Sequence, residues 1–300
     1  MKIFDCFMYM NEDVVLDLRL NYLNEYVDYF VIVESTYFHN GKKKKLNFDF
    51  KKFKYFKEKI IYVVLNEEPN DIETINETDS EKIKNSKHIL NGMRRDYFQR
   101  NFIQKGLEAC KENDIVLISD IDEIPNLENF NKYSIKNEIV FFKQKMFYYK
   151  FDLCSKDISW YGTRGCRKKI LKNPQWLRNL KSKYYSYLRL DTFFYKNKVR
   201  CAKFINDGGW HFSYLNSPEQ IENKLKNYAH YWEYNISKLQ INEIRDKIKK
   251  KISIYDLKVD MKKSKFKSGQ KLEHVELDAL PKYLKNNITK YKPWLDLNYE

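Results

Sequence analysis

A short apolar strand that runs into a cluster of acidic residues is the feature that most constrains the fold of this chain. The strand covers residues 114–119, and Asp120-Ile121-Asp122-Glu123-Ile124-Pro125 follows it directly. Pro125 cannot donate a backbone hydrogen bond, which ends the strand and places the acidic residues in a turn. In open α/β folds, ligands bind at the carboxyl ends of the strands. The segment therefore predicts an α/β fold with a functional edge at this turn.

The spacing of Asp120 and Asp122 predicts a site for a divalent cation. Carboxylate oxygens suit Mg²⁺ and Mn²⁺, which are commonly held by one or two carboxylates together with substrate phosphates. Asp-x-Asp triplets also occur by chance, and turns are rich in aspartate, so a plain turn is the alternative. The apolar run before the pair and Glu123 after it favour a metal site that binds Mn²⁺ or Mg²⁺ beside a phosphate-bearing substrate.

Regular elements recur along the first part of the chain at the spacing of an α/β protein. Apolar strands are predicted over four segments: 2–9, 28–34, 60–65 and 114–119. One helix follows Asp13, and a second is predicted over 80–110 with an interruption near Gly92, while residues 67–79 are predicted to be a loop. This order predicts a Rossmann-like, mainly parallel sheet with flanking helices and no internal repeat.

The second part of the chain changes character after the acidic turn. Three segments are predicted to form a hairpin, a loop and a further β-like region: 138–143 with 146–152, then 157–169, then 192–205. A helix is predicted to begin at Ser217, which can cap it, with Pro218 and Gln220 in favoured positions. We expect one unit over residues 1–215 and a helical, Lys-rich C-terminal subregion over 216–300 that packs on it.

The composition predicts a globular chain with a substantial core. Of its 300 residues, 43% are hydrophobic and 16% are aromatic. The formal net charge is +15, but lysine is spread along the chain together with Asn, Ile, Tyr and Phe, as an AT-rich genome would produce. A basic surface attracts nucleotide diphosphates, anionic glycans or anionic lipid. We expect no nucleic-acid partner. The non-enzyme alternative is a basic protein that binds nucleic acid, with an affinity that falls steeply as the salt concentration rises.

No segment predicts export or insertion into a membrane. The five cysteines are odd in number and show no Cys-x₂-Cys spacing, which argues against a zinc ribbon and favours a reducing compartment. The amino terminus offers no signal peptide, and no apolar run approaches the roughly 18 residues of a membrane span. We expect a cytoplasmic protein whose Lys-rich C-terminal helices could make peripheral contact with a membrane.

Further residues could serve the substrate beside the acidic pair. Three arginines of the second helix could add positive charge or form a solvated face: Arg94, Arg95 and Arg100. Glu34 ends the second strand at the same sheet edge, where it would contact a nucleotide or simply close the strand. Trp160 and Tyr161 offer flat faces for stacking on a substrate ring, and core packing is their alternative role.

An aromatic and an imidazole side chain follow a glycine pair in the second half. Trp210 and His211 come after Gly208-Gly209, and a neutral imidazole can complete a carboxylate metal shell, particularly for Mn²⁺. The alternative is a structural histidine beside Trp210. Asp207 could be the base that deprotonates an acceptor hydroxyl, or only a turn residue.

Five blocks of the sequence resemble glycosyltransferase family 17, which contains β-1,4-mannosyl-glycoprotein 4-β-N-acetylglucosaminyltransferase. The blocks lie within residues 3–235 and are Phe4-Asp5-Cys6-Phe7 with Asn11-Glu12, residues 27–35, Gln99-Arg100-Asn101, residues 118–125, and Gly209-Trp210-His211-Phe212-Ser213. Together they are specific, although none would be alone.

The resemblance implies a GT-A type catalytic domain over residues 1–215 and inversion at the anomeric carbon. It implies a nucleotide-sugar donor, with UDP-N-acetylglucosamine the first to consider, and a glycan or glycoconjugate acceptor. Asp120 and Asp122 match the Asp-x-Asp of the family, and His211 matches its Trp-His segment. We therefore expect these three residues to hold the metal.

The resulting hypothesis is a metal-dependent inverting glycosyltransferase. Its donor site would contain Glu34, Arg94, Arg95, Arg100 and Asp120. Its acceptor site would contain Trp160, Tyr161 and Trp210, with Asp207 or Glu123 as the catalytic base. A nucleotidyltransferase is the alternative enzyme, because it also uses paired aspartates, but the chain has no Gly-rich phosphate loop.

Overall fold

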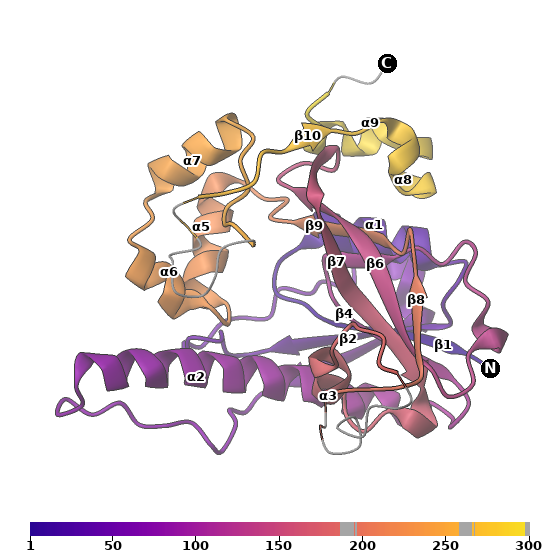
Figure 1. Ribbon diagram of the computed structural model, residues 1–300, viewed down its shortest axis with the longest axis horizontal. Coiled ribbons are helices and arrows are strands. Elements are labelled where there is room, and N and C mark those ends of the chain that lie inside the picture. Colours follow the sequence, from indigo (N-terminus) through magenta and orange to yellow (C-terminus); the bar gives the residue numbers. More distant parts are fainter. Residues whose placement is uncertain (187–194, 196, 258–265, 267, 298–300) are drawn as a thin grey trace.

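The centre of the computed structural model is one curled sheet flanked by helices (Figure 1). The structure describes residues 1–186, 195, 197–257, 266 and 268–297. Its hydrogen-bonded strand order is β3 (Ile60–Leu65), β2 (Tyr29–Ser35), β1 (Ile3–Met8), β4 (Ile115–Asp120), β7 (Leu153–Arg167), β6 (Ile139–Tyr148), β9 (Gly209–Ser213) and β5 (Glu123–Pro125). In addition, β8 (Ala202–Ile205) pairs with β6, and β10 (Glu273–His274) pairs with β7.

The first four strands form a parallel, Rossmann-like half. β1 is parallel to both β2 and β4, and β2 is parallel to β3. Helix α1 (Asp13–Leu23) connects β1 to β2, and α2 (Glu81–Asn101) lies between β3 and β4. β1, β2 and β4 are almost wholly buried, as apolar strands covered on both faces should be. The predicted α/β class, the four strands and the loop over 67–79 are confirmed.

The core lies on both faces of this half because successive residues of a strand point to opposite sides. In β2, Phe30 and Ile32 join a cluster with α1, whereas Val31 and Val33 join a second cluster on the other face. A third apolar cluster lies where the helices after residue 217 pack against the ends of β6 and β7.

The other half of the sheet is mixed, and there two predictions are wrong. Residues 139–148 form one strand rather than a hairpin, and the predicted loop over 157–169 is mostly strand β7. Gln144, taken as a turn residue, is 1% exposed, and its side chain bonds to Thr163 of β7. Polar residues inside these strands therefore led to the wrong prediction of turns. Of the β-like segment 192–205, only 202–205 is a described strand, and residues 192–194 and 196 lie outside the described part.

Helix α2 is continuous, so the interruption expected near Gly92 is wrong. Ser80 caps its amino end by accepting a hydrogen bond from the backbone N–H of Ile83. A Cβ at Gly92 would lie 2.6 Å from the carbonyl oxygen of Ala229. The glycine thus permits a close approach between α2 and the chain ahead of α6 and does not break the helix. A six-residue 3₁₀ segment over Phe102–Leu107 ends the helical region.

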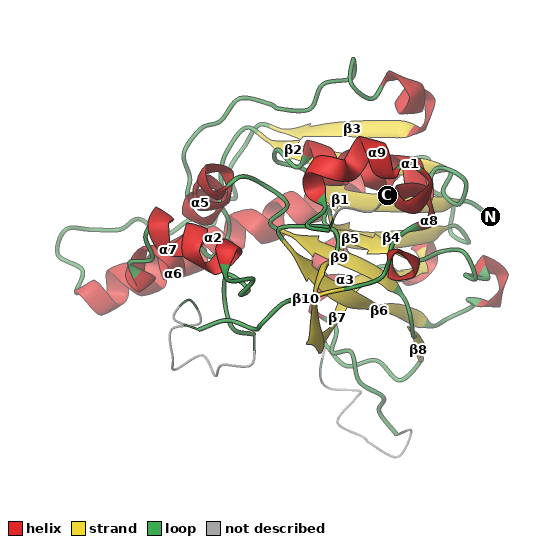
Figure 2. Ribbon diagram, turned by 90° about the horizontal axis from the view of Figure 1, so that it is seen from above, coloured by secondary structure: helices red, strands yellow, loops and turns green. Residues whose placement is uncertain are grey.

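In its described part, the chain after residue 216 forms short helices and one short strand. Its helices are α5 (Pro218–Asn227), α6 (Tyr231–Ser237), α7 (Ile241–Lys249), α8 (Lys282–Asn286) and α9 (Ile288–Tyr291). Ser217 and Gln220 form the predicted capping box of α5. Figure 1 shows α5, α6 and α7 grouped beside the sheet, whereas Figure 2 shows α8 and α9 close to α1. The domain boundary at residue 215 stays a prediction. Among the described helices, none combines the length and apolar character needed to cross a membrane.

Candidate active site

A cavity of about 300 Å³ lies at the carboxyl ends of β1 and β4. The parallel register places Met8 of β1 beside Asp120 of β4, so the turns that follow both strands meet at this edge. Asp122, His211 of β9 and Lys224 of α5 also line the cavity. Elements far apart in the sequence therefore converge where α/β folds bind ligands.

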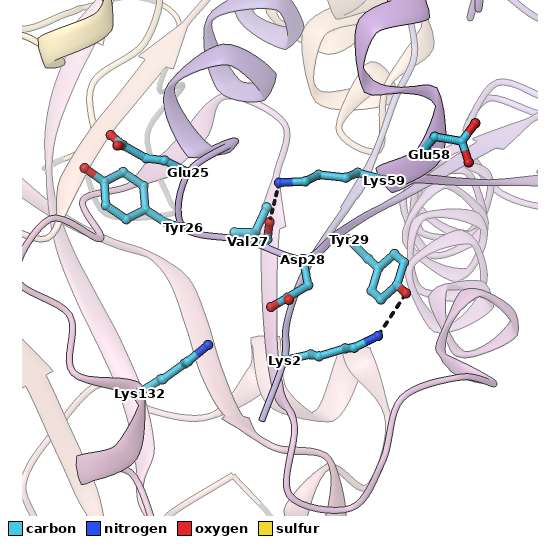
Figure 3. A pocket seen from close by; sticks show the side chains of 9 residues that line it. All are labelled: Lys2, Glu25, Tyr26, Val27, Asp28, Tyr29, Glu58, Lys59 and Lys132. Carbon is cyan, nitrogen blue, oxygen red and sulfur yellow. Dashed lines mark hydrogen bonds between the residues drawn. The ribbon is translucent and has the colours of Figure 1, made fainter.

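A second hollow of about 350 Å³ lies at the opposite edge, where the parallel strands begin (Figure 3). Its basic groups are partly engaged within the protein: Lys2 Nζ donates to Tyr29 Oη at 3.0 Å, and Lys59 Nζ donates to the Val27 carbonyl at 3.1 Å. All the residues predicted for the functional site are described, and none of them lines this hollow. We therefore place the candidate site in the first cavity.

Arg19 of α1 holds the backbone of the acidic turn. Its guanidinium forms a two-pronged ion pair with Asp5 of β1, at 2.6 and 2.7 Å, and both side chains are fully buried. Arg19 Nη1 also donates to the carbonyl oxygens of Asp120 (3.2 Å), Ile121 (3.0 Å) and Glu123 (2.8 Å). One buried cation thus holds three carbonyl groups in and around the turn. The sequence offers one signal for this arginine, a charged residue (Asp5) inside the apolar strand β1.

Asp120 lies between two arginines. Its Oδ1 is 3.0 Å from Arg100 Nη2, and its Oδ2 is 3.0 Å from Arg178 Nη2 of α3 (Pro174–Asn179). Burial by itself would raise the pKa of Asp120, but the Arg178 and Arg100 charges outweigh it and hold the pKa well below its usual range. The carboxylate is therefore ionised, and both its oxygens are already engaged.

Glu123 forms the centre of a buried hydrogen-bond network. Its Oε1 accepts from Trp160 Nε1 at 2.7 Å and Arg178 Nη2 at 3.0 Å. Its Oε2 accepts from the Asp120 backbone N–H and from Arg178 Nη1, both at 2.8 Å. The side chain is fully buried and does not line the cavity. This geometry positions Arg178 and the turn, while the role of Glu123 as a base stays a prediction.

The side chains of Asp122 and His211 lie next to one another in the wall of the cavity. Asp122 Oδ1 is 3.4 Å from His211 Nε2, and Asp122 Oδ2 is 3.8 Å from Lys224 Nζ. Burial opposes charge on both groups, but the pKa of Asp122 is lowered by His211 and Lys224, and the pKa of His211 is raised by Asp122. Strand pairing fixes this contact, because the backbone N–H of Phe212 donates to the Asp122 carbonyl at 2.8 Å.

The chemistry of Asp122 and His211 fits a Mn²⁺ or Mg²⁺ site with few protein ligands. The Asp122 Oδ1 and His211 Nε2 atoms, 3.4 Å apart, can share one cation. His211 Nε2 also lies 3.0 Å from Ser213 Oγ, whereas the buried His211 Nδ1 has no hydrogen-bond partner among the described residues. Within the described part of the chain, no group of three or more His, Cys, Asp and Glu residues is arranged to hold a metal. Phosphate and water oxygens would therefore have to complete the shell.

The three arginines predicted to bind the donor are not equivalent. Arg100 lines the cavity beside Asp120. Arg94 pairs with Glu73 at 2.7 Å, and Arg95 pairs with Glu68, and neither lines the cavity. The fixed charge of α2 at the candidate site therefore comes from Arg100.

Glu34 is fully buried and organises the segment that follows β2. Its carboxylate accepts hydrogen bonds from the backbone N–H groups of Asn47 (2.7 Å) and Phe48 (3.0 Å) and pairs with Lys44. Lys44 lines the cavity, whereas Glu34 does not. Its donor-binding role stays a prediction.

Of the remaining predicted residues, Trp160 alone lines the cavity. Tyr161 packs against Phe204, with ring centroids 5.5 Å apart. Trp210 is 6% exposed and donates its Nε1–H to the Ala279 carbonyl at 2.6 Å. Asp207 lies in a turn with φ 50°. Its side chain is 73% exposed.

Lys224 is the main cavity residue that the sequence analysis did not single out. It lies three positions after Ile221 and one before Leu225, both fully buried. A lysine on the apolar face of a helix was therefore the available signal. Arg178 offered no comparable signal, because its partners Asp120 and Glu123 lie far from it in the sequence.

The fold and the cavity define an α/β protein with a charged candidate ligand site at the carboxyl edge of a Rossmann-like sheet. The model of the family described as Glycosyltransferase family 17 matches residues 1–298. The chain therefore belongs to this family, as its motifs predicted, and is a glycosyltransferase. Membership implies a nucleotide-sugar donor and a glycan acceptor. A search of curated proteins found no match.

Proposed function

We propose that the protein is a metal-dependent, inverting glycosyltransferase of the GT-A type that transfers N-acetylglucosamine from UDP-N-acetylglucosamine to a glycan hydroxyl. The observation that carries the proposal is the convergence of Asp122, His211 and Arg100 on one cavity at the carboxyl edge of the sheet. Such an edge is where an open α/β fold binds a nucleotide. The expected cytoplasmic location, and the peripheral membrane contact, stay predictions.

In this proposal, Asp122 and His211 would hold Mn²⁺ or Mg²⁺ on the donor diphosphate. The bound cation would act as a Lewis acid that neutralises charge on the leaving nucleoside diphosphate. Arg100 contributes a fixed positive charge on the other side of the acidic turn and keeps Asp120 ionised. Trp160 presents an aromatic face to the cavity for contact with a sugar ring.

Inversion requires a single displacement at the anomeric carbon. The acceptor oxygen forms the new glycosidic bond while the bond to the phosphate oxygen breaks, and a carboxylate base takes the hydroxyl proton. Asp207 and Glu123 are the predicted bases. Neither lines the cavity in this structure.

The proposal is tested by thermal-shift measurements with UDP- and GDP-sugars, each with and without Mn²⁺. A ligand that binds only the native state raises its melting temperature. We expect a Mn²⁺-dependent rise with UDP-N-acetylglucosamine and, with a suitable glycan, release of UDP. Asp122→Asn should abolish the transfer and keep the melting temperature of the free protein, and Glu108→Gln, a change at an exposed residue, should affect neither. A folded protein that responds to no nucleotide would contradict the proposal.

A further inference from the structure

We propose that Lys224 of α5 binds the diphosphate of the donor and supplies a positive charge to the leaving group. The inference rests on the function proposed for the cavity. It brings a residue of the C-terminal subregion into the donor site, next to the turn that carries Asp120 and Asp122. It also assigns to Lys224 a role that the sequence alone had suggested for Arg94 and Arg95.

The helix fixes Lys224 in the cavity wall. The capping box of Ser217 and Gln220 starts α5, and the fully buried side chains of Ile221 and Leu225 turn one face of the helix to the protein interior. Lys224 lies on that face, and its side chain is only 15% exposed. Its ammonium is thus held in place before any substrate arrives.

The ammonium retains hydrogen-bonding capacity. Lys224 Nζ is 3.0 Å from Glu12 Oε1 and 3.8 Å from Asp122 Oδ2, and the second distance is too long for a hydrogen bond. Of these two carboxylates, Glu12 alone is therefore within hydrogen-bonding distance of Lys224 Nζ. An ammonium has three N–H donors, which leaves donors for phosphate oxygens.

The charge of Lys224 is also only partly neutralised. The other carboxylate oxygen of Glu12 accepts hydrogen bonds from the backbone N–H groups of Met10 (3.1 Å) and Asn11 (3.0 Å), so Glu12 divides its charge among three donors. Hydrogen bonds between ionised groups are stronger than neutral ones, and more so away from water. A largely buried lysine is consequently an effective site for an anion.

The position of Lys224 beside Asp122 indicates that this anion is the diphosphate. Asp122 and His211 are the residues that would hold the cation on the diphosphate, and Lys224 is 3.8 Å from Asp122. A phosphate over this pair is therefore within reach of the ammonium. Arg94 and Arg95 cannot bind the diphosphate in these positions, because they pair with acidic residues outside the cavity.

The test compares Lys224→Met with Lys226→Met by calorimetry with UDP and with uridine, in the presence of Mn²⁺. Lys226 is on the same helix, but its side chain is 51% exposed and pairs with Glu222 at 2.9 Å. We expect Lys224→Met to weaken UDP binding at least tenfold and to leave uridine binding unchanged. Lys226→Met should change neither affinity. Unchanged UDP binding by folded Lys224→Met, or an equal loss for UDP and uridine, would overturn the inference.

A measurement on the unaltered protein covers the case in which Lys224→Met does not fold. Reductive methylation followed by mass spectrometry reports the reactivity of each lysine amine. UDP should protect Lys224 and not Lys226, and uridine should protect neither. If the unaltered protein binds neither UDP nor GDP, the proposed function fails and this inference fails with it. If UDP binds while Lys224 stays unprotected, only this inference fails.

Discussion

Replacement of Arg19 by methionine should destabilise the protein severely. The guanidinium and the Asp5 carboxylate are both fully buried, so the change leaves an unpaired charge inside the protein. Breaking a buried ion pair in this way costs about 3–5 kcal/mol. The three carbonyl oxygens of the acidic turn also lose a donor, at about 1–3 kcal/mol for each that finds no other partner. The sum approaches the roughly 5–15 kcal/mol by which proteins are stable.

A second variant separates the two contributions. In Arg19→Met combined with Asp5→Leu, no charge remains unpaired, so most of the ion-pair cost should disappear, while the carbonyl oxygens still lack their donor. The double variant should therefore lie between Arg19→Met and the unaltered protein in stability. It should also bind UDP with Mn²⁺ more weakly than the unaltered protein does, because the turn that carries Asp122 is no longer held.

Urea unfolding followed by circular dichroism at pH 7 measures these differences. Arg245→Met is the matched control, because Arg245 is 51% exposed and its pair with Glu219 at 2.8 Å lies at the surface. It should cost no more than about 1 kcal/mol. Stability of Arg19→Met within about 1 kcal/mol of the unaltered protein would contradict the expected cost of the unpaired Asp5 charge. A double variant no more stable than Arg19→Met would refute the attribution to an unpaired charge.

Three further predictions address pH, capping and packing. Burial lowers the pKa of His39 below its usual 6.5, so the imidazole binds a proton more readily in the unfolded chain than in the folded one. The free energy of unfolding should therefore fall as the pH drops from 7 to 5. In His39→Gln, the urea midpoint should fall less over the same pH range. Ser217→Ala removes the cap of α5 and should cost about 0.5–2 kcal/mol, whereas the exposed Ser86→Ala should cost less. Gly162→Ala places a Cβ 2.7 Å from Glu123 Cδ and should cost about 1–3 kcal/mol and reduce transfer.

Each of these three predictions has a result that contradicts it. For His39, it is an equal pH dependence in the unaltered protein and in His39→Gln. For the cap, it is a Ser217→Ala variant as stable as Ser86→Ala. For Gly162→Ala, it is full transfer activity together with unchanged stability.

The parallel half of the sheet could be predicted because its signals are local. β1, β2, β3 and β4 are apolar runs in the sequence. The turn expected through Pro125 is wrong in part, because the turn covers Ile121 and Asp122, and Glu123–Pro125 form strand β5, which pairs with β9. The β6–β7 pair could not be predicted in the same way. Gln144 resembles a turn residue until its bond to Thr163 is known, and Gly162 resembles a loop residue until its close approach to Glu123 is known. Both facts depend on contacts between distant parts of the chain.

The residues of the candidate site likewise fall into those that a local motif predicts and those that only distant contacts reveal. Asp122 and His211 were recognisable because each belongs to a short motif beside a strand end. Arg94 and Arg95 were indistinguishable from Arg100 on one helix, and only their partners in space separate them. A basic residue becomes part of a site through the carboxylate it meets, and single-sequence patterns do not reveal that partner.

The pairing of β5 with β9 has a consequence for how this protein tolerates changes in length. Glu123 lies opposite His211, so the distance between Asp122 and the imidazole is set by hydrogen bonds across two short strands. The many residues between the two strands can lengthen or shorten in their loops without altering it. One residue inserted within β9 would instead turn the imidazole to the other face of the sheet. Chains that share this arrangement could therefore differ widely in loop length between the two strands, but not within them.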